Sequence, residues 1–239
     1  MVVKSELKLI KSLQQKKCRI EYGLFVVEGK KTVEEVVNSD INVYKLFAVD
    51  PVGLEIGDVH VEKVTARELS QMSSLKNPNG YLGVFYIPKQ TEKITSDWML
   101  VLDGVQDPGN LGTIIRLCDW FGINDIVCST DTVDCYNPKV LQATMGSITR
   151  VKIQYMPLDA FLVSTQLNIY GTFMDGDNVN TVQLPEKGIM VMGNEGKGVS
   201  DAIAKLCTNR LAIPQFGGVT TESLNVASAT AILLHEIRK

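Results

Sequence analysis

The sequence predicts an α/β protein in which a small N-terminal α/β domain precedes a larger α/β domain built on a parallel sheet. Two observations lead to this class. Short apolar strand candidates alternate with helix candidates along the chain, and one polar stretch, at 88–97, interrupts the alternation. The length of 239 residues suits one large domain or two modest ones. We therefore expect domains at 1–90 and 98–239, joined by a linker at 91–97.

The first 90 residues contain the elements of the small domain. A helix is predicted over 4–17, where apolar side chains recur near helical spacing without Gly or Pro. Strands are predicted at 24–27, 43–49 and 81–87. The pairs Thr32/Glu35 and Thr65/Glu68 have the Thr-x-x-Glu spacing of capping boxes, so we expect a helix to begin at each.

From residue 98 the alternation restarts and fills the second domain. Strands are predicted at 98–102, 125–128, 151–155, 168–173, 188–192 and 210–213. Helices are predicted at 111–121, 138–145, 158–165, 200–206 and 224–238. Such alternation implies parallel strands with helices on the faces and ligands at the carboxyl ends of the strands. The loops at 103–110, 193–199 and 214–223 are therefore the expected ligand-binding segments.

Composition narrows the classes of function. No stretch reaches the eighteen apolar residues of a membrane span, and polar residues break every apolar run near the N-terminus. The five cysteines form no C-x-x-C pair, and the two histidines lie in no metal-binding or triad pattern. We therefore expect a cytoplasmic protein with no membrane or metal partner, and a histidine-based hydrolase is disfavoured.

The charge is distributed unevenly. A net charge of −3 and a pI near 5.5 argue against strong binding to nucleic acid. The first 31 residues nevertheless hold eight Lys and Arg against three Asp and Glu, a local charge of +5. From charge alone, a solvated helix surface is the simpler interpretation of this segment, and an RNA-binding surface is the alternative.

The glycine-bearing loops do not match the common nucleotide-binding motifs. The run at 193–198 lacks the leading Gly and the Ser or Thr of a P-loop, and no G-x-G-x-x-G follows the first strand of the second domain. ATP and NAD binding of the usual kind are therefore disfavoured. The loops instead carry the polar residues Asn110, Glu195, Ser223 and Asn225, together with glycines that let the backbone approach a ligand.

The helix predicted at 111–121 has two different faces. Its apolar face consists of Leu111, Ile114, Ile115 and Cys118. Asn110 directly precedes this face, where a helix cap is the simplest role. Arg116 falls on the opposite side, beside Trp120. Because Trp and Arg are enriched at interfaces, we expect a homodimer contact near the site.

The last predicted helix, 224–238, is apolar nearly all round, so we expect it to be buried on more than one side. Ser223 and Asn225 at its start could be helix-capping residues or could place a ligand against unpaired N–H groups. The spacing does not separate these two roles.

Three segments of the second domain, taken in order, resemble the motifs of a known family. They are 107–116 (DPGNLGTIIR), 191–198 (VMGNEGKG), and 213–214 followed by 222–226 (IP and ESLNV). They resemble the three motifs of the SpoU (TrmH-like) RNA 2′-O-ribose methyltransferases of the SPOUT superfamily. The resemblance implies a C-terminal domain with a deep trefoil knot that binds S-adenosylmethionine. Residues 25–29 (FVVEG) resemble the ribosomal-protein-like RNA-binding domain that often precedes it.

The resemblance also implies roles for individual residues. It places Asn110, Arg116, Glu195, Ser223 and Asn225 at catalytic or site-shaping positions. It places Thr172, Met192, Gly193, Ile213 and Leu224 around the S-adenosylmethionine. Since a guanidinium is effectively always protonated, Arg116 is expected to stabilise the developing alkoxide rather than act as a base.

The implied function is methylation of the ribose 2′-OH of a structured RNA, with ribosomal RNA favoured over transfer RNA. One alternative is a non-catalytic RNA-binding or ribosome-assembly protein that has kept the fold; the intact set of catalytic residues argues against it. Another is a small-molecule enzyme of the Rossmann type, which would need the glycine fingerprint that this chain lacks.

Overall fold

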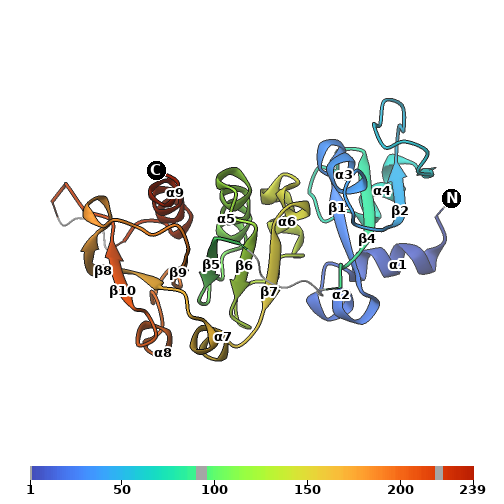
Figure 1. Cartoon of the computed structure of the whole chain (residues 1–239). Coiled ribbons are helices and arrows are strands. Elements are labelled where there is room, and N and C mark those ends of the chain that lie inside the picture. Colours follow the sequence, from blue (N-terminus) through green and yellow to red (C-terminus); the bar gives the residue numbers. More distant parts are fainter. Residues whose placement is uncertain (1, 90–95, 219–222) are drawn as a thin grey trace. The chain divides into compact units, whose positions relative to one another are not determined.

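The computed structural model describes residues 2–89, 96–218 and 223–239. The chain forms two compact units (Figure 1). Unit 1 comprises residues 1–91 and 134–149, and unit 2 comprises residues 92–133 and 150–239. The segment 134–149, which the sequence gives no reason to separate from the second domain, thus packs with the N-terminal residues.

Unit 1 is built on a four-stranded mixed sheet in the order β1-β4-β2-β3. Its strands are β1 (Leu24–Glu28), β2 (Val43–Ala48), β3 (Val61–Lys63) and β4 (Tyr81–Tyr86). Its helices are α1 (Lys4–Ser12), α2 (Lys16–Tyr22), α3 (Lys30–Val37), α4 (Ala66–Met72), α6 (Pro138–Thr144) and the 3₁₀ helix η1 (Ser147–Thr149). Strand β4 pairs antiparallel with β1 and β2, and β2 pairs parallel with β3. Fully buried side chains such as Ile10, Phe47 and Leu82 form its core.

The single helix predicted over 4–17 is wrong, because the chain forms α1 and α2 with a break between them. The buried guanidinium of Arg19 donates to the carbonyl oxygens of Leu13 (2.8 Å) and Gln14 (2.9 Å). It also forms an ion pair with Asp134. The carbonyl groups of Leu13 and Gln14 therefore accept hydrogen bonds from a side chain and not from the backbone N–H groups of a continuing helix. The helix ends at this point.

The two predicted capping boxes have different outcomes. The box at Thr65 is confirmed: its hydroxyl accepts from the N–H of Glu68, and the Glu68 carboxylate accepts from the N–H of Thr65. The box at Thr32 is wrong, because α3 begins at Lys30 with Gly29 as its N-cap residue. Gly29 has φ 101°, a conformation that favours glycine, and Thr32 lies buried in the first turn.

Unit 2 is built on a six-stranded sheet in the order β10-β8-β9-β5-β6-β7. Its strands are β5 (Trp98–Leu102), β6 (Asp125–Cys128), β7 (Lys152–Tyr155), β8 (Ile169–Asn178), β9 (Gly188–Met192) and β10 (Asn209–Ala212). Its helices are α5 (Pro108–Phe121), α7 (Leu158–Ser164), α8 (Asp201–Ala204), α9 (Val226–Ile237) and the 3₁₀ helix η2 (Val179–Thr181). Every neighbouring pair is parallel, which confirms the predicted parallel sheet.

The order of the strands directs attention to the carboxyl ends of β5 and β9. From β5 the sheet grows through β6 to β7 on one side, while β9 lies beside β5 on the other. Such a reversal of strand order leaves a crevice in which α/β proteins bind ligands. The trefoil knot stays a prediction.

Among the described helices, none combines the length and the hydropathy needed to cross a lipid bilayer.

Candidate active site

The carboxylate of Glu195, in the loop after β9, holds the loop that follows β5. One carboxylate oxygen accepts from the backbone N–H of Asp107 (3.1 Å) and the side-chain amide of Asn110 (3.1 Å), and the other accepts from the N–H of Gln106 (3.2 Å). Partial burial on its own raises the pKa of Glu195, but these hydrogen bonds outweigh it and the net pKa is lowered. Glu195 therefore stays ionised at neutral pH and fixes the loop.

Asn110 connects this pair of loops to the start of α9. The side-chain amide of Asn225 donates to the side-chain oxygen of Asn110 (2.9 Å), and its own oxygen accepts from the N–H groups of Ala227 and Ser228. Asn225 is therefore the N-cap residue of α9 as well as part of the site. The three predicted residues Asn110, Glu195 and Asn225 form one chain of hydrogen bonds that ties three segments together.

The capping role considered for Asn110 is wrong. Helix α5 begins at Pro108, and its N-cap residue is Asp107, whose carboxylate accepts from the N–H of Asn110 (2.8 Å). Asn110 lies inside the first turn. Its side chain is therefore free to bond with Glu195 and Asn225 instead of with its own helix.

Two further residues shape these loops and were given no role from the sequence. The Asn194 amide donates to the carbonyl oxygen of Gly104 (2.7 Å), while its oxygen accepts from the N–H groups of Gly196 and Lys197. The Asp103 carboxylate accepts from the N–H of Ser200 (2.7 Å). An Asn that precedes a Gly-rich turn is a known turn signal, so Asn194 could have been found. The contact of Asp103, 97 residues away in sequence, could not.

Helix α5 presents the two faces that its spacing predicts. Leu111, Ile114, Ile115 and Cys118 are fully buried. Arg116 is exposed on the other side, and 83% of Trp120 is accessible. Arg116 makes no hydrogen bond or ion pair with another described residue, and the same holds for the exposed Ser223. The structure thus does not join these two to the hydrogen-bonded group.

The residues predicted around S-adenosylmethionine lie mostly at the carboxyl ends of three adjacent strands. Met192 ends β9 and is buried, Gly193 follows it, and Ile213 follows β10. Thr172 lies within β8, directly after the last residue that pairs with β9, Gly171. The pairing with β10 is also interrupted here, because Arg210 pairs with Gly171 and Leu211 pairs with Asp177. Leu224 belongs to no strand; it precedes α9 in the chain and is 53% exposed.

The backbone at Gly193 fits a closely approaching ligand. A Cβ atom on Gly193 would lie 2.1 Å from the carbonyl carbon of Gly198, so the turn admits only glycine. No described residue accepts from the backbone N–H of Gly193 or of Ile213. These two backbone donors, at the carboxyl ends of β9 and β10, which flank β8, have no acceptor among the described residues. The ring nitrogens of adenine can accept from such groups, so these residues fit the predicted cofactor.

The expectation that the last helix is buried on more than one side is wrong for a single chain. The buried residues of α9 are Val226, Ala227, Thr230, Leu233 and Leu234. They recur at spacings of four, seven and eight and therefore occupy one face. Ile232, on another face, is exposed.

The described residues contain no cluster of three or more His, Cys, Asp or Glu side chains suited to a metal ion.

Comparison with known proteins decides the family. Residues 97–235 match the model of the SpoU rRNA Methylase family, and residues 4–83 match the MRM3-like substrate binding domain. The chain belongs to the SpoU rRNA methylase family. This confirms the predicted class, an S-adenosylmethionine-dependent RNA 2′-O-methyltransferase with the SPOUT fold and an N-terminal substrate-binding domain.

Similar proteins agree with this assignment along the whole chain. The 23S rRNA (guanosine(2553)-2′-O)-methyltransferase RlmP of Bacillus subtilis is 31% identical over 95% of this chain and 94% of its own length. A structure from Porphyromonas gingivalis, assigned to the TrmH family of RNA methyltransferases, is 35% identical with a TM-score of 0.90, covering 100% of this SpoU chain and 98% of that one. An AdoMet-bound rRNA methyltransferase from Sinorhizobium meliloti is 27% identical with a TM-score of 0.84, covering 100% and 96%.

Proposed function

We propose that this SpoU protein methylates a ribose 2′-OH of large-subunit ribosomal RNA, with residues 1–90 holding the RNA and residues 98–239 performing the transfer. The observation that carries the proposal is the hydrogen-bonded group Asn225–Asn110–Glu195. It fixes three loops around one place at the carboxyl ends of β5 and β9. The whole-length similarity to RlmP, which acts on 23S rRNA, favours ribosomal over transfer RNA.

The chemistry requires an in-line approach of the 2′ oxygen to a methyl group, which S-adenosylmethionine supplies when bound. The backbone of Gly193 and Ile213, with Thr172, Met192 and Leu224 nearby in the motifs, would hold that cofactor. Glu195 is a positioning residue, because its oxygens already accept three N–H groups and its lowered pKa makes it a poor proton acceptor. Asn110 and Asn225 transmit this positioning.

Arg116 is the residue we propose for stabilising the alkoxide that develops on the 2′ oxygen. It is exposed and unpaired within the described chain, so its planar fork of donors is available to RNA. Ser223, also exposed, would contact the same substrate. We expect Arg116→Lys, which keeps the charge and loses the fork, to lower the rate constant of single-turnover methylation about tenfold to a hundredfold. An unchanged rate would show that only the charge matters.

The experiment that tests the function is a map of 2′-O-methyl groups in total RNA from cells with and without the gene. We expect one position in 23S rRNA to lose its methyl group, and the nucleotide equivalent to guanosine 2553 is the first to inspect. Complementation with the Glu195→Gln variant should leave that position unmethylated. A lost site in transfer RNA, or no lost site, would contradict the proposal.

We also propose that the protein acts as a homodimer. Helices α5 and α9 pack against each other, and each leaves a large apolar side chain in solvent, Trp120 and Ile232. Trp is enriched at protein–protein interfaces, and exposing its large apolar surface to water is unfavourable. We expect wild-type protein to have the mass of a dimer by light scattering, and Trp120→Ala to shift it toward the monomer.

The five free cysteines agree with action in a reducing cytoplasm.

A further inference from the structure

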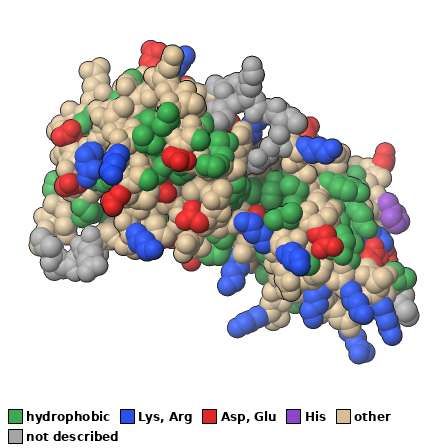
Figure 2. Space-filling model, turned by 90° about the horizontal axis from the view of Figure 1, so that it is seen from below, with side chains coloured by type: hydrophobic (Ala, Val, Ile, Leu, Met, Phe, Trp, Pro, Cys, Tyr) green, Lys and Arg blue, Asp and Glu red, His purple; other side chains and the backbone are tan. Residues whose placement is uncertain are grey.

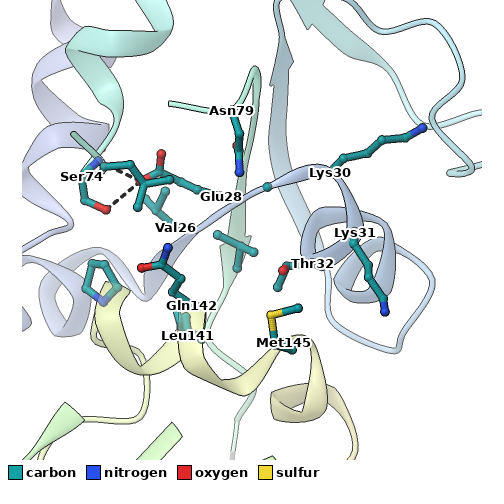
Figure 3. A pocket seen from close by; sticks show the side chains of 14 residues that line it. Val26, Glu28, Lys30, Lys31, Thr32, Ser74, Asn79, Leu141, Gln142 and Met145 are labelled. Carbon is teal, nitrogen blue, oxygen red and sulfur yellow. Dashed lines mark hydrogen bonds between the residues drawn. The ribbon is translucent and has the colours of Figure 1, made fainter. Parts of the chain in front are cut away.

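Unit 1 contains a pocket that lies at the N-terminus of α3, between β1 and α6. It has a volume of about 240 Å³, and all its lining residues belong to unit 1. Figure 3 shows Asn79, Gln142 and Met145 around it, with Thr32, in the first turn of α3, beside Met145. The volume is smaller than that of pockets for drug-sized ligands, so it suits one small group or one nucleotide unit.

The start of α3 offers donors that the protein leaves unused. Gly29, the N-cap residue, has no side chain with which to cap the helix. No described residue accepts from the backbone N–H groups of Lys30, Lys31 and Thr32. These groups, together with the helix dipole, form an anion-binding arrangement at the pocket wall.

The hydroxyl of Thr32 is a second and independent sign of a ligand. Thr32 is 8% exposed, lines the pocket, and makes no hydrogen bond with another described residue. A buried Thr in a helix commonly bonds to the carbonyl oxygen four residues earlier, as Thr230 does with Val226 (2.7 Å). Although most of the Thr32 side chain is buried, its hydroxyl is not among the fully buried polar atoms that lack a partner, so it stays accessible at the pocket, where a ligand atom can bond to it.

The charges around the pocket favour an anion, and their placement favours a chain of phosphates. The one carboxylate in the lining, Glu28, already accepts from the N–H of Ser74 (2.8 Å) and from the hydroxyls of Ser73 and Ser74. The side chains of Lys30 and Lys31 extend away from the pocket (Figure 3). A free nucleotide would keep all its phosphates near the helix terminus, whereas an RNA strand leaving the pocket would carry further phosphates toward these lysines.

We propose that this pocket receives one nucleotide of the RNA substrate, with a backbone phosphate at the α3 N-terminus and Thr32 and the base against the wall formed by Val26, Leu141 and Met145. The side-chain amides of Asn79 and Gln142 line the pocket, where they can bond to base edges. Unstacked nucleotides of loops and bulges are the parts of RNA that proteins read in this way. The inference rests on RNA being the substrate, and it names where unit 1 holds it.

Photo-crosslinking locates the contact. Full-length protein is irradiated with a 23S rRNA transcript containing 4-thiouridine, and crosslinked peptides are identified by mass spectrometry. We expect crosslinks in peptides from 26–32 or 141–145. Crosslinks confined to other peptides would contradict the pocket but leave the proposed function intact. Absence of crosslinks anywhere would contradict both.

Affinity measurements test the chemistry with matched variants. We expect Lys30→Gln/Lys31→Gln to weaken binding of the same transcript at least about tenfold and to lower the salt slope by about one or two. Thr32→Val, which removes one hydrogen bond, should weaken it about fivefold. The control Lys63→Gln/Lys205→Gln makes the same charge change at exposed lysines outside the pocket and should change affinity less than twofold.

Two more measurements separate the remaining outcomes. Calorimetry should show that all these variants bind S-adenosylmethionine as the wild type does, because the cofactor residues lie in unit 2. Guanosine monophosphate and inorganic phosphate should bind only weakly to the wild type. Tight binding of either, lost in Thr32→Val while the transcript binds unchanged, would assign the pocket to a free nucleotide or phosphate and overturn the proposal.

Discussion

The candidate active-site loops of unit 2 and the pocket of unit 1 differ in how their polar groups are hydrogen-bonded. In unit 2, Glu195, Asn110 and Asn225 bond to one another and to the loop backbone, so these polar groups have partners without a ligand. In unit 1, the first N–H groups of α3 and the Thr32 hydroxyl have no described partner. Figure 2 also shows several Lys and Arg side chains gathered at the lower right of the view.

The difference would match the two tasks that we propose, catalysis in unit 2 and RNA binding in unit 1. Catalysis requires groups held in place before the reaction, because reorganisation during the reaction raises the barrier. Binding of a long RNA gains from donors that find an acceptor only in the complex, because each new hydrogen bond to the RNA forms without breaking one inside the protein. The contrast is testable, because the same type of substitution should have opposite effects in the two units.

The largest expected effect comes from breaking the order of the unit 2 site. Glu195→Gln keeps the shape of the side chain but replaces one acceptor oxygen with a donor, which then faces either the N–H of Gln106 or the N–H of Asp107 and the amide of Asn110. We expect methylation to fall about a hundredfold or more, because a displacement near 1 Å at a reacting group has that cost. Affinity for the RNA transcript should stay within about threefold. A variant with normal turnover would show that the loops are held without Glu195.

A smaller effect of opposite sign is expected in unit 1. Thr32→Val replaces a hydroxyl that bonds to no described residue with a methyl group on a largely buried side chain, so the free energy of unfolding in urea should rise slightly, by at most about 1 kcal/mol, while RNA affinity falls. Thr230→Val is the matched control in unit 2, because Thr230 is also buried in a helix but bonds to Val226. That substitution should leave stability unchanged or lower it. Equal effects of the two substitutions would remove the contrast.

Much of this contrast is beyond sequence reasoning, and the reasons are physical. The strands of unit 2 and the faces of α5 follow from local periodicity, and the motifs place Asn110, Glu195 and Asn225. The hydrogen bonds among them join residues 85 and 115 positions apart, which no local pattern encodes. The break between α1 and α2 depends on Arg19 and its distant partner Asp134. The pocket depends on residues 134–149 packing with unit 1.

The smallest expected effect is a pH dependence that reports on Glu195. Its folded pKa lies below the ordinary value of 4.5, so the stability it contributes is complete above that value and is lost as the pH falls through the folded pKa. The difference in Tm between the wild type and Glu195→Gln should therefore be constant from about pH 8 to about pH 5 and shrink below it. Asp103 and Asp107, the other carboxylates of the loop after β5, are present in both proteins. A difference that already shrinks between neutrality and pH 6 would indicate a raised pKa, and Glu195 would then be a candidate proton acceptor rather than a fixed acceptor of N–H groups.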